Sequence, residues 1–229
     1  MEDKFAGKSS SARIKETYLK SLGESYGEFT LGENTTRILL ESPRNLLFNL
    51  ARYKFVTKMF DGFKNVLEVG CQEGFGAHLV SGGVDHLDCL DFYHPYIDSC
   101  CRRINSSKIK FFAHDMLDSP VLNSYDGIFA LDVLEHIEKE AENQFIENIC
   151  ESLGENGSLI IGMPSIESQK YASKSSKIGH VNCKNMLELK EFMQTYFSNV
   201  FTFGMNDEVL HTGYPQMSHY VLALCCSLK

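Results

Sequence analysis

The sequence predicts an α/β fold in which helices cover both faces of a mostly parallel, seven-stranded sheet with an antiparallel C-terminal strand. Short apolar runs of strand length alternate with stretches of helical periodicity in the middle of the chain. The last two apolar runs, residues 199–203 and 219–226, have no helix between them, which predicts an antiparallel pair. The chain has 229 residues, of which 43% are hydrophobic, so it can bury one substantial core.

The N-terminal segment differs in composition from the rest of the chain. Residues 1–42 are largely polar, with glycine and serine clustered near the start, and we interpret them as an arm or cap. Residues 43–229 are expected to form the main domain. Its first element is a predicted helix: Ser42 and Pro43 form an N-cap and first-turn pair, and apolar residues follow at helical spacing up to Gly62.

Five short apolar runs predict the parallel strands. The first run ends at Gly70, and a glycine there favours a close approach of the backbone to a ligand at the edge of the sheet. Two amphipathic helices are predicted at residues 137–153, where Gly154 is the stop signal, and at residues 186–197. The five runs are residues 66–70, 86–91, 109–113, 127–131 and 158–163.

Composition and charge exclude several classes of protein. With 22 Lys and Arg against 30 Asp and Glu, the formal charge is -8, which disfavours nucleic acid as a partner. Residues 1–20 offer neither the apolar run of a signal peptide nor a membrane helix. The eight cysteines include two adjacent pairs in a chain too long to need disulfides, so free thiols are predicted. We therefore expect a soluble protein of the reducing cytoplasm.

The loop after the first strand predicts a nucleotide-like cofactor. Glycine stands at Gly70 and Gly74, whereas a dinucleotide motif would need glycine at the positions of Gln72 and Phe75. A helix start built for pyrophosphate is therefore poorly supported. The acidic Glu68, two residues before the first glycine, suits a cationic ligand.

The segment Glu68-Val69-Gly70-Cys71-Gln72-Glu73-Gly74 resembles the first motif of class I S-adenosylmethionine-dependent methyltransferases. That motif is an acidic residue, an apolar residue and then G-x-G-x-G, and Gln72 takes the place of the middle glycine. The resemblance covers residues 43–226 in the order of elements and implies a Rossmann-like fold and S-adenosylmethionine as cofactor. It places six residues against the cofactor: Glu68, Gly70, Cys71, Gln72, Gly74 and Leu131.

Acidic residues at the ends of the next two strands fit the same cofactor. Asp91 ends the second strand, where a carboxylate can accept both ribose hydroxyls, and Asp88 inside that strand is the alternative. The resemblance assigns the ribose to Asp91 and the adenine amino group to Asp115, with the backbone amide of Met116 against the ring. The side chains of Phe92 and Met116 either sandwich the adenine or pack in the core.

The segment after the fourth strand carries the candidate catalytic groups. At helical spacing Asp132 shares a face with Glu135 and His136, and His180 lies on the loop after the fifth strand. This pattern resembles the metal-dependent O-methyltransferases of ubiquinone synthesis and small-RNA 3′ ends, which implies that these four residues bind Mg²⁺ or Mn²⁺. Alternatively, the acids only favour a helix N-terminus and His136 or His180 is a general base without metal.

The acceptor pocket is less well defined by the sequence. Its predicted walls are the arm with Tyr18 and Tyr26, the loop 165–177, and a hairpin turn with His211 and Tyr214. Two basic residues before the first strand, Arg52 and Lys54, are candidates for the cofactor carboxylate or an anionic acceptor, with a solvated helix face as the alternative.

The leading functional hypothesis is methyl transfer from S-adenosylmethionine to an oxygen, in preference to a nitrogen, of a small polar metabolite such as a sugar or a biosynthetic intermediate. Metal-dependent O-methyl transfer is an alternative mechanism. A cofactor-binding interaction module without catalysis and a nicotinamide-dependent oxidoreductase are alternatives from other classes. A small-molecule acceptor is the expected partner, and the sequence does not define an oligomeric state.

Overall fold

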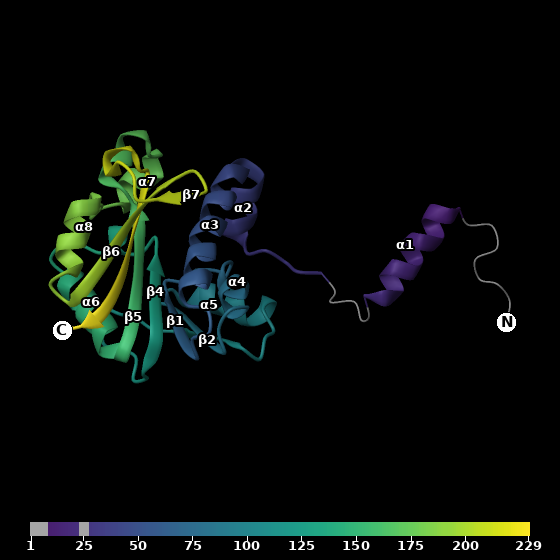
Figure 1. Ribbon diagram of the computed structural model, residues 1–229, viewed down its shortest axis with the longest axis horizontal. Helices are drawn as coiled ribbons and strands as arrows, with labels where there is room; N and C mark the ends of the chain where they lie inside the picture. The colour runs from purple at the N-terminus through teal and green to yellow at the C-terminus, as the bar shows by residue number, and fades with distance from the viewer. Residues whose placement is uncertain (1–8, 23–27) are drawn as a thin grey trace. The chain divides into compact units, whose positions relative to one another are not determined.

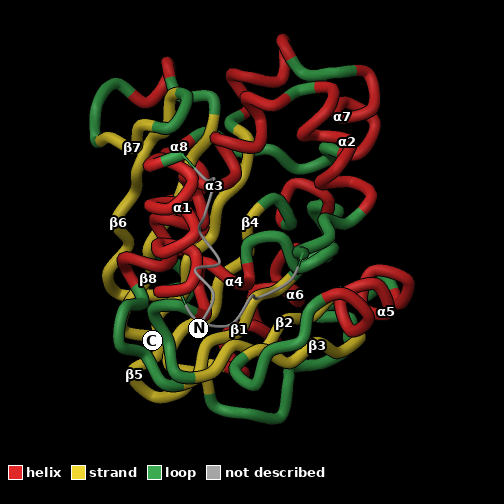
Figure 2. Tube along the Cα trace, turned by 90° about the vertical axis from the view of Figure 1, so that its right-hand side faces the viewer, coloured by secondary structure: helices red, strands yellow, loops and turns green. Residues whose placement is uncertain are grey.

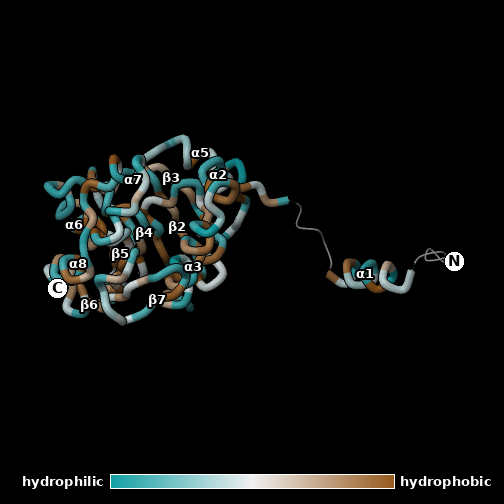
Figure 3. The backbone as a smooth tube through the Cα atoms, turned by 90° about the horizontal axis from the view of Figure 1, so that it is seen from above, coloured by the Kyte–Doolittle hydropathy of each residue, from teal (hydrophilic) through white to brown (hydrophobic). Residues whose placement is uncertain are grey.

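The computed structural model describes residues 9–22 and 28–229. The chain divides into two compact units, Met1–Thr30 and Leu31–Lys229 (Figure 1). In the first unit, helix α1 (Ser10–Ser21) begins where the Ser9 side chain accepts a hydrogen bond from the backbone N–H of Ala12. Hydrophobic and hydrophilic residues both occur along α1 (Figure 3). This helix was not among the predicted elements of the arm, and the role of residues 1–42 as a cap stays a prediction.

The second unit is built on one eight-stranded sheet with the order β3-β2-β1-β4-β5-β8-β6-β7. Strands β1 to β5 pair in parallel, and β8 runs antiparallel between β5 and β6. Figure 2 shows β1, β2 and β3 side by side. The bounds are β1 Asn65–Val69, β2 His86–Asp91, β3 Ile109–Ala113, β4 Tyr125–Leu131, β5 Leu153–Pro164, β6 Phe197–Asn206, β7 Val209–His211 and β8 Tyr220–Leu228.

The predicted fold class is confirmed, including the antiparallel C-terminal end. The predicted strand number is one too low, because β7 is a three-residue edge strand and too short to show an apolar run. Among the described residues, no helix has both the length and the apolar character needed to cross a membrane. All eight cysteines are free thiols, and Cys101 is the exposed one.

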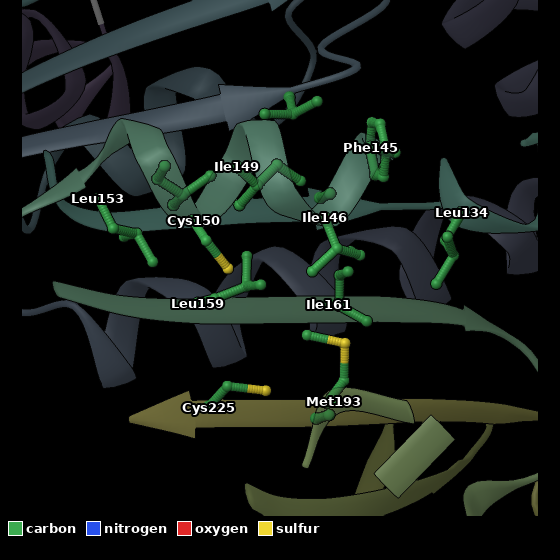
Figure 4. Close-up of a cluster of buried hydrophobic side chains, with 14 of the residues drawn as sticks. Leu134, Phe145, Ile146, Ile149, Cys150, Leu153, Leu159, Ile161, Met193 and Cys225 are labelled. Carbon is green, nitrogen blue, oxygen red and sulfur yellow. The ribbon is translucent and has the colours of Figure 1, made fainter. Parts of the chain in front are cut away.

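Helices cover both faces of this sheet (Figure 1). One hydrophobic cluster joins one face to α6 and α8, and Figure 4 shows the side chains of Ile146 and Ile161 within it. A second cluster joins the opposite face to α3, α4 and α5. The helices are α2 Glu33–Glu41, α3 Pro43–Met59, α4 Ala77–Ser81, α5 His94–Arg103, α6 Glu142–Ser152, α7 Lys174–Gly179 and α8 Met186–Met193.

Two predicted helices are shorter than their periodicity suggested. Helix α6 begins at Glu142 rather than at residue 137, and Leu153 already belongs to β5, where it pairs with Tyr125. Helix α8 ends at Met193, four residues before the start of β6 at Phe197. At the C-terminal ends, Leu153 and Phe197 continue the helical pattern but belong to the strands that follow, which periodicity alone cannot distinguish. Residues 137–141, before α6, form a bend and a turn.

The segment from Asp132 to His136 is not an α-helix. The backbone of Asp132 is left-handed, with a φ of 57°, and only Leu134–His136 form a single 3-10 turn. The prediction that Asp132 shares a helical face with Glu135 and His136 is therefore wrong. Because the backbone of Asp132 is left-handed, its side chain does not point in the same direction as those of Glu135 and His136.

Candidate active site

A cavity of about 640 Å³ opens at the carboxyl ends of β1, β2 and β4. This edge is where ligands bind in parallel α/β sheets. Helices α2 and α3 also contribute to its walls, through Thr35, Ile38, Leu46 and Asn49. Eight of the predicted cofactor residues line it: Gly70, Cys71, Gln72, Asp91, Phe92, Asp115, Met116 and Leu131.

The loop between β1 and α4 has the backbone that its glycines allow. Gly70 and Gly74 have φ values of 78° and 67°, and a Cβ at either position would collide with a neighbouring side chain. Gln72, in place of the family's middle glycine, is also left-handed, with a φ of 49°. The loop therefore has three left-handed residues, of which the middle one is not glycine, and Gly74 lies outside the cavity lining.

Asp91 lies at the end of β2, 5% exposed, and lines the cavity. Its carboxylate accepts hydrogen bonds from the backbone N–H groups of Gln72 (3.0 Å) and Tyr93 (2.9 Å). Burial raises the pKa of Asp91, and these two hydrogen bonds act in the opposite direction. The alternative residue, Asp88, instead accepts a hydrogen bond from the Tyr125 hydroxyl at 2.7 Å and does not line the cavity. The geometry thus favours Asp91 over Asp88 as a ligand-binding acid.

The next part of the cavity is lined by Asp115, Met116 and Phe92. The Asp115 carboxylate accepts the backbone N–H of Leu117 at 2.9 Å, and the Met116 carbonyl accepts the Asn148 amide at 2.7 Å. These bonds fix the backbone after β3. Met116 is buried, whereas Phe92 is 70% exposed, so the Phe92 ring has little packing of its own.

Glu68 does not enter the cavity lining, which corrects its interpretation as the partner of a cationic ligand. Its carboxylate is buried and accepts hydrogen bonds from the Tyr53 hydroxyl (2.7 Å) and the Cys89 thiol (3.5 Å). Burial raises the pKa of Glu68 to about 7. The residue links β1 to α3 and thereby supports the loop that follows β1.

Three of the four predicted metal ligands come together. One potential ligand atom from each of Glu135, His136 and His180 lies within 4.8 Å of the other two. The two imidazole rings are 5.2 Å apart between centroids. The Glu135 carbonyl accepts the backbone N–H groups of Val181 (2.8 Å) and Asn182 (3.1 Å), which holds the segment after α7 against the end of β4.

The same group has two properties of a ligand site. Glu135 is fully buried, and neither carboxylate oxygen has a hydrogen-bond partner. His136 Nδ1 is 2.8 Å from the Gly179 carbonyl, and His180 Nδ1 is 2.9 Å from Gln169 Oε1. With Nδ1 engaged in each ring, Nε2 is left to bind a metal or accept a proton.

Burial favours the neutral forms of Glu135 and His180. Burial, and then the charge of Asp132, raise the pKa of Glu135 well above its usual range. Burial, and then the neighbouring His136, lower the pKa of His180. Of the three residues, only His136 lines the cavity, so the group lies at the cavity wall.

Asp132 is absent from this group because it pairs with Arg52. Arg52 Nη1 lies 2.6 Å from Asp132 Oδ2, and the guanidinium stacks over the Tyr220 ring at 3.7 Å from its centroid. The side chain of Arg52 is 12% exposed, so the alternative of a solvated helix face is wrong for this residue. Lys54 is exposed and does not line the cavity.

Several predicted acceptor walls are not part of the cavity lining. The loop 165–177, His211 and Tyr214 do not contribute to it. Tyr18 belongs to the first unit, and Tyr26 lies outside the described residues.

Glu73, a buried acid of the glycine loop, lines the cavity and was not among the predicted site residues. Its signal was an acidic residue inside a loop where small residues are expected. The part of the cavity wall formed by α2 and the start of α3 was not predicted either, because these helices are distant in sequence from the strand ends that they cover.

Comparison with known proteins identifies a methyltransferase domain in this chain. Residues 66–157 match a family described as a methyltransferase domain. No curated protein sequence matches the chain. The matched segment contains the glycine loop, Asp91, Asp115 and the end of β4, and the match confirms the resemblance inferred from the first motif.

Solved structures share the fold at low sequence identity. N-methyltransferase NodS from Bradyrhizobium japonicum WM9, in complex with S-adenosyl-L-homocysteine, is 18% identical with a TM-score of 0.61, over 82% of this chain and 90% of that one. The methyltransferase domain of bacterial CtHen1-C is 15% identical with a TM-score of 0.65, over 78% and 98%. The CurJ carbon methyltransferase is 13% identical with a TM-score of 0.63, over 85% and 58%. Because these proteins include N- and carbon methyltransferases, the likeness leaves the acceptor atom open.

Proposed function

We propose that this class I S-adenosylmethionine-dependent methyltransferase transfers the methyl group to an oxygen, in preference to a nitrogen, of a small polar metabolite such as a sugar or a biosynthetic intermediate. The observation that carries the proposal is the group of Glu135, His136 and His180 at the wall of the cofactor cavity. A hydroxyl acceptor must lose a proton during transfer, and this group offers proton-accepting nitrogens at that point.

The cofactor is proposed to extend along the carboxyl edge of the sheet. Asp91 would accept the ribose hydroxyls, because its carboxylate lines the cavity and its free lone pairs remain available. Asp115 and the ring of Phe92 would bind the adenine, with Met116 beneath it. The methionine part would then lie against Gly70 and Leu131, beside Asp132 and the buried Arg52.

The acceptor would reach the methyl group from the side of His136. Displacement at a sulfonium methyl has an activated leaving group, so alignment and exclusion of water supply much of the acceleration. The roof residues Ile38 and Leu46 would exclude water. His136 Nε2 or His180 Nε2 would take the proton, since Nδ1 of each ring is already bonded.

The same three residues fit a hard divalent cation such as Mg²⁺ or Mn²⁺. The fit rests on the two unpartnered, buried oxygens of Glu135 and on the engaged Nδ1 atoms, which leave one nitrogen per ring for a metal. When bound, the cation would lower the pKa of an acceptor hydroxyl. Asp132 is not proposed as a ligand, because Arg52 occupies its carboxylate.

The proposal is tested by incubating the protein with methyl-labelled S-adenosylmethionine and a fractionated metabolite extract, followed by mass spectrometry of the labelled products. We expect a labelled O-methyl metabolite, with Asp91→Ala as the variant that loses the product. Saturable binding of S-adenosylhomocysteine without any labelled product would favour the non-catalytic module. Stabilisation by NAD and not by S-adenosylmethionine would favour an oxidoreductase.

A second arm of the experiment concerns the cation. Protein treated with chelator and then dialysed is assayed with and without added Mg²⁺ or Mn²⁺. Loss of turnover and its return with metal would support the metal-assisted mechanism. Unchanged turnover would leave His136 and His180 as the proton-accepting groups.

A further inference from the structure

Helix α2 lacks a cap from its own sequence. Its N-cap residue is Gly32, which has no side chain to accept the first backbone N–H groups. Glu73, from the glycine loop, supplies the missing acceptor. Its carboxylate accepts the backbone N–H of Asn34 at 3.0 and 3.1 Å and that of Thr35 at 3.2 Å.

The two partners are fitted to each other. A Cβ atom on Gly32 would collide with the Glu73 side chain, so glycine at the N-cap is what allows the carboxylate to reach the helix. Glu73 is 5% exposed, and its negative charge lies against the positive end of the α2 dipole. The contact therefore stabilises the helix and, at the same time, fastens it to the loop.

Helix α2 is in turn part of the cavity roof. Thr35 and Ile38 line the cavity, as do Glu73 itself and Tyr96 of α5. The Asn34 side-chain amide donates to the Tyr96 hydroxyl at 2.9 Å, which gives α2 a second attachment beside the proposed adenosine site. The N-terminus of α2 is thus held from two sides of the cofactor cavity.

The position of Glu73 is itself fixed. Arg103, at the end of α5, donates from Nη2 to the Glu73 carbonyl at 2.7 Å, and from Nε to Ser99. The backbone of the glycine loop is therefore tied to α5, and the carboxylate is held toward α2. Glu73 thus belongs to the loop proposed to bind the cofactor, and its carboxylate caps α2, the helix that covers the same cavity.

We propose that Glu73 is a positioning residue that seats helix α2 over the bound cofactor, so that affinity for the cofactor depends on a cap supplied by the cofactor loop. The inference rests on the proposed cofactor site. Glu73 acts through α2, and the atoms that react are elsewhere in the cavity.

The first test compares Glu73→Ala with the parent protein by calorimetry and steady-state kinetics. We expect the dissociation constant for S-adenosylhomocysteine and the KM for S-adenosylmethionine to rise by about tenfold, as for loss of a buried charge-assisted cap. The kcat at saturating cofactor should stay within about twofold. The matched control is Glu155→Ala, at an exposed acid in β5, which should change neither constant.

A second variant separates seating from simple helix stability. A Cβ on Gly32 would also meet the Glu73 Cβ at 2.7 Å, so this variant uses Glu73→Gly, which removes that atom. The added change Gly32→Ser then gives α2 a cap of its own in an extended N-cap backbone, and the double variant is compared with Glu73→Gly alone. We expect this double variant to recover thermal stability but not cofactor affinity. Recovery of both would show that Glu73 matters only for helix formation and would overturn the inference.

Hydrogen exchange of the Asn34 and Thr35 amides in cofactor-free protein gives an independent readout. These amides should exchange faster in Glu73→Gln, which keeps the shape of the side chain and removes its charge, than in the parent protein. Equal protection would contradict the inference. If the parent protein binds no S-adenosylhomocysteine, the proposed function fails, while the exchange comparison still decides whether Glu73 seats α2.

Discussion

The two ends of the cavity are built in different ways. At the end proposed for adenosine, here the adenosine end, the carboxylates of Asp91 and Asp115 already accept hydrogen bonds from nearby backbone N–H groups. At the end proposed for the acceptor, here the acceptor end, both carboxylate oxygens of the buried Glu135 have no hydrogen-bond partner. Unpaired buried polar groups destabilise a folded protein, so the two oxygens of Glu135, beside the cavity wall, are candidates for bonds to a ligand.

Cofactor binding and methyl transfer place different demands on the same edge of the sheet. At the adenosine end, hydrogen bonds to backbone N–H groups already orient the carboxylates of Asp91 and Asp115, which limits the entropy lost on binding. The acceptor end keeps unpaired groups in a poorly solvated position, where charge developing in a transition state is most strongly stabilised. Substitutions at the two ends should therefore separate affinity from turnover.

The largest effect is expected at the acceptor end, from His180→Ala. Loss of one proton-accepting or metal-binding nitrogen should lower kcat by about 10² to 10⁴, whereas the dissociation constant for S-adenosylhomocysteine should change little. Single-turnover methyl transfer measures the first and calorimetry the second. The control is His78→Ala, at an exposed histidine of α4. A normal kcat in His180→Ala would remove this residue from the reaction.

The sequence predicted the adenosine end better than the acceptor end, for a physical reason. Gly70, Asp91 and Asp115 each lie at or just after the end of a strand, so parallel pairing brings them to one edge without further information. The ion pair of Arg52 with Asp132 depends on a left-handed residue and on partners far apart in the chain. Because hydrophobic periodicity does not encode a left-handed turn, the sequence did not show that Asp132 lies apart from the other three predicted metal ligands.

A smaller effect, on cofactor affinity and not on kcat, is expected at the adenosine end, from Asp91→Ala. Removal of a charge-assisted acceptor from a buried position should weaken S-adenosylhomocysteine binding by about 2 kcal/mol. Calorimetry on the variant and on Asp98→Ala, an exposed acid of α5, measures this difference. Undiminished affinity in Asp91→Ala would contradict the ribose assignment. It would also remove the expected contrast between an end of the cavity that sets affinity and an end that sets turnover.

Beneath the glycine loop, Glu68 predicts a change of stability with pH. Burial raises its pKa from 4.5 to about 7, so the folded protein favours the neutral carboxyl more than the unfolded chain does. Its contribution to stability is complete below pH 4.5 and is lost as the pH rises toward about 7. Glu68→Gln removes this loss, so its melting temperature should exceed that of the parent at pH 8 and approach it at pH 5. Thermal melts of both proteins, with Glu155→Gln as control, should show this gap; parallel curves would mean that Glu68 is ionised in the fold.

The smallest effect is expected from Gln72→Gly. Gln72 and Asp132 are the left-handed non-glycine residues at the two ends of the cavity, with φ values of 49° and 57°. The described hydrogen bonds of Gln72 come from its backbone, including its N–H to Asp91. Glycine at position 72 should therefore relieve about 1 kcal/mol of backbone strain, partly offset by the greater freedom of the unfolded chain. Cofactor affinity should stay within about twofold.

The contrasting variant is Asp132→Gly, which gains the same backbone relief but leaves Arg52 buried without its partner. An uncompensated buried charge costs more than the strain it replaces, so this variant should be less stable than the parent protein. Thermal melts and calorimetry on the two glycine variants compare the ends of the cavity directly. If Gln72→Gly abolished cofactor binding, the Gln72 side chain itself would contact the ligand. The adenosine end would then depend on a side chain that the motif does not supply, because glycine normally stands at that position.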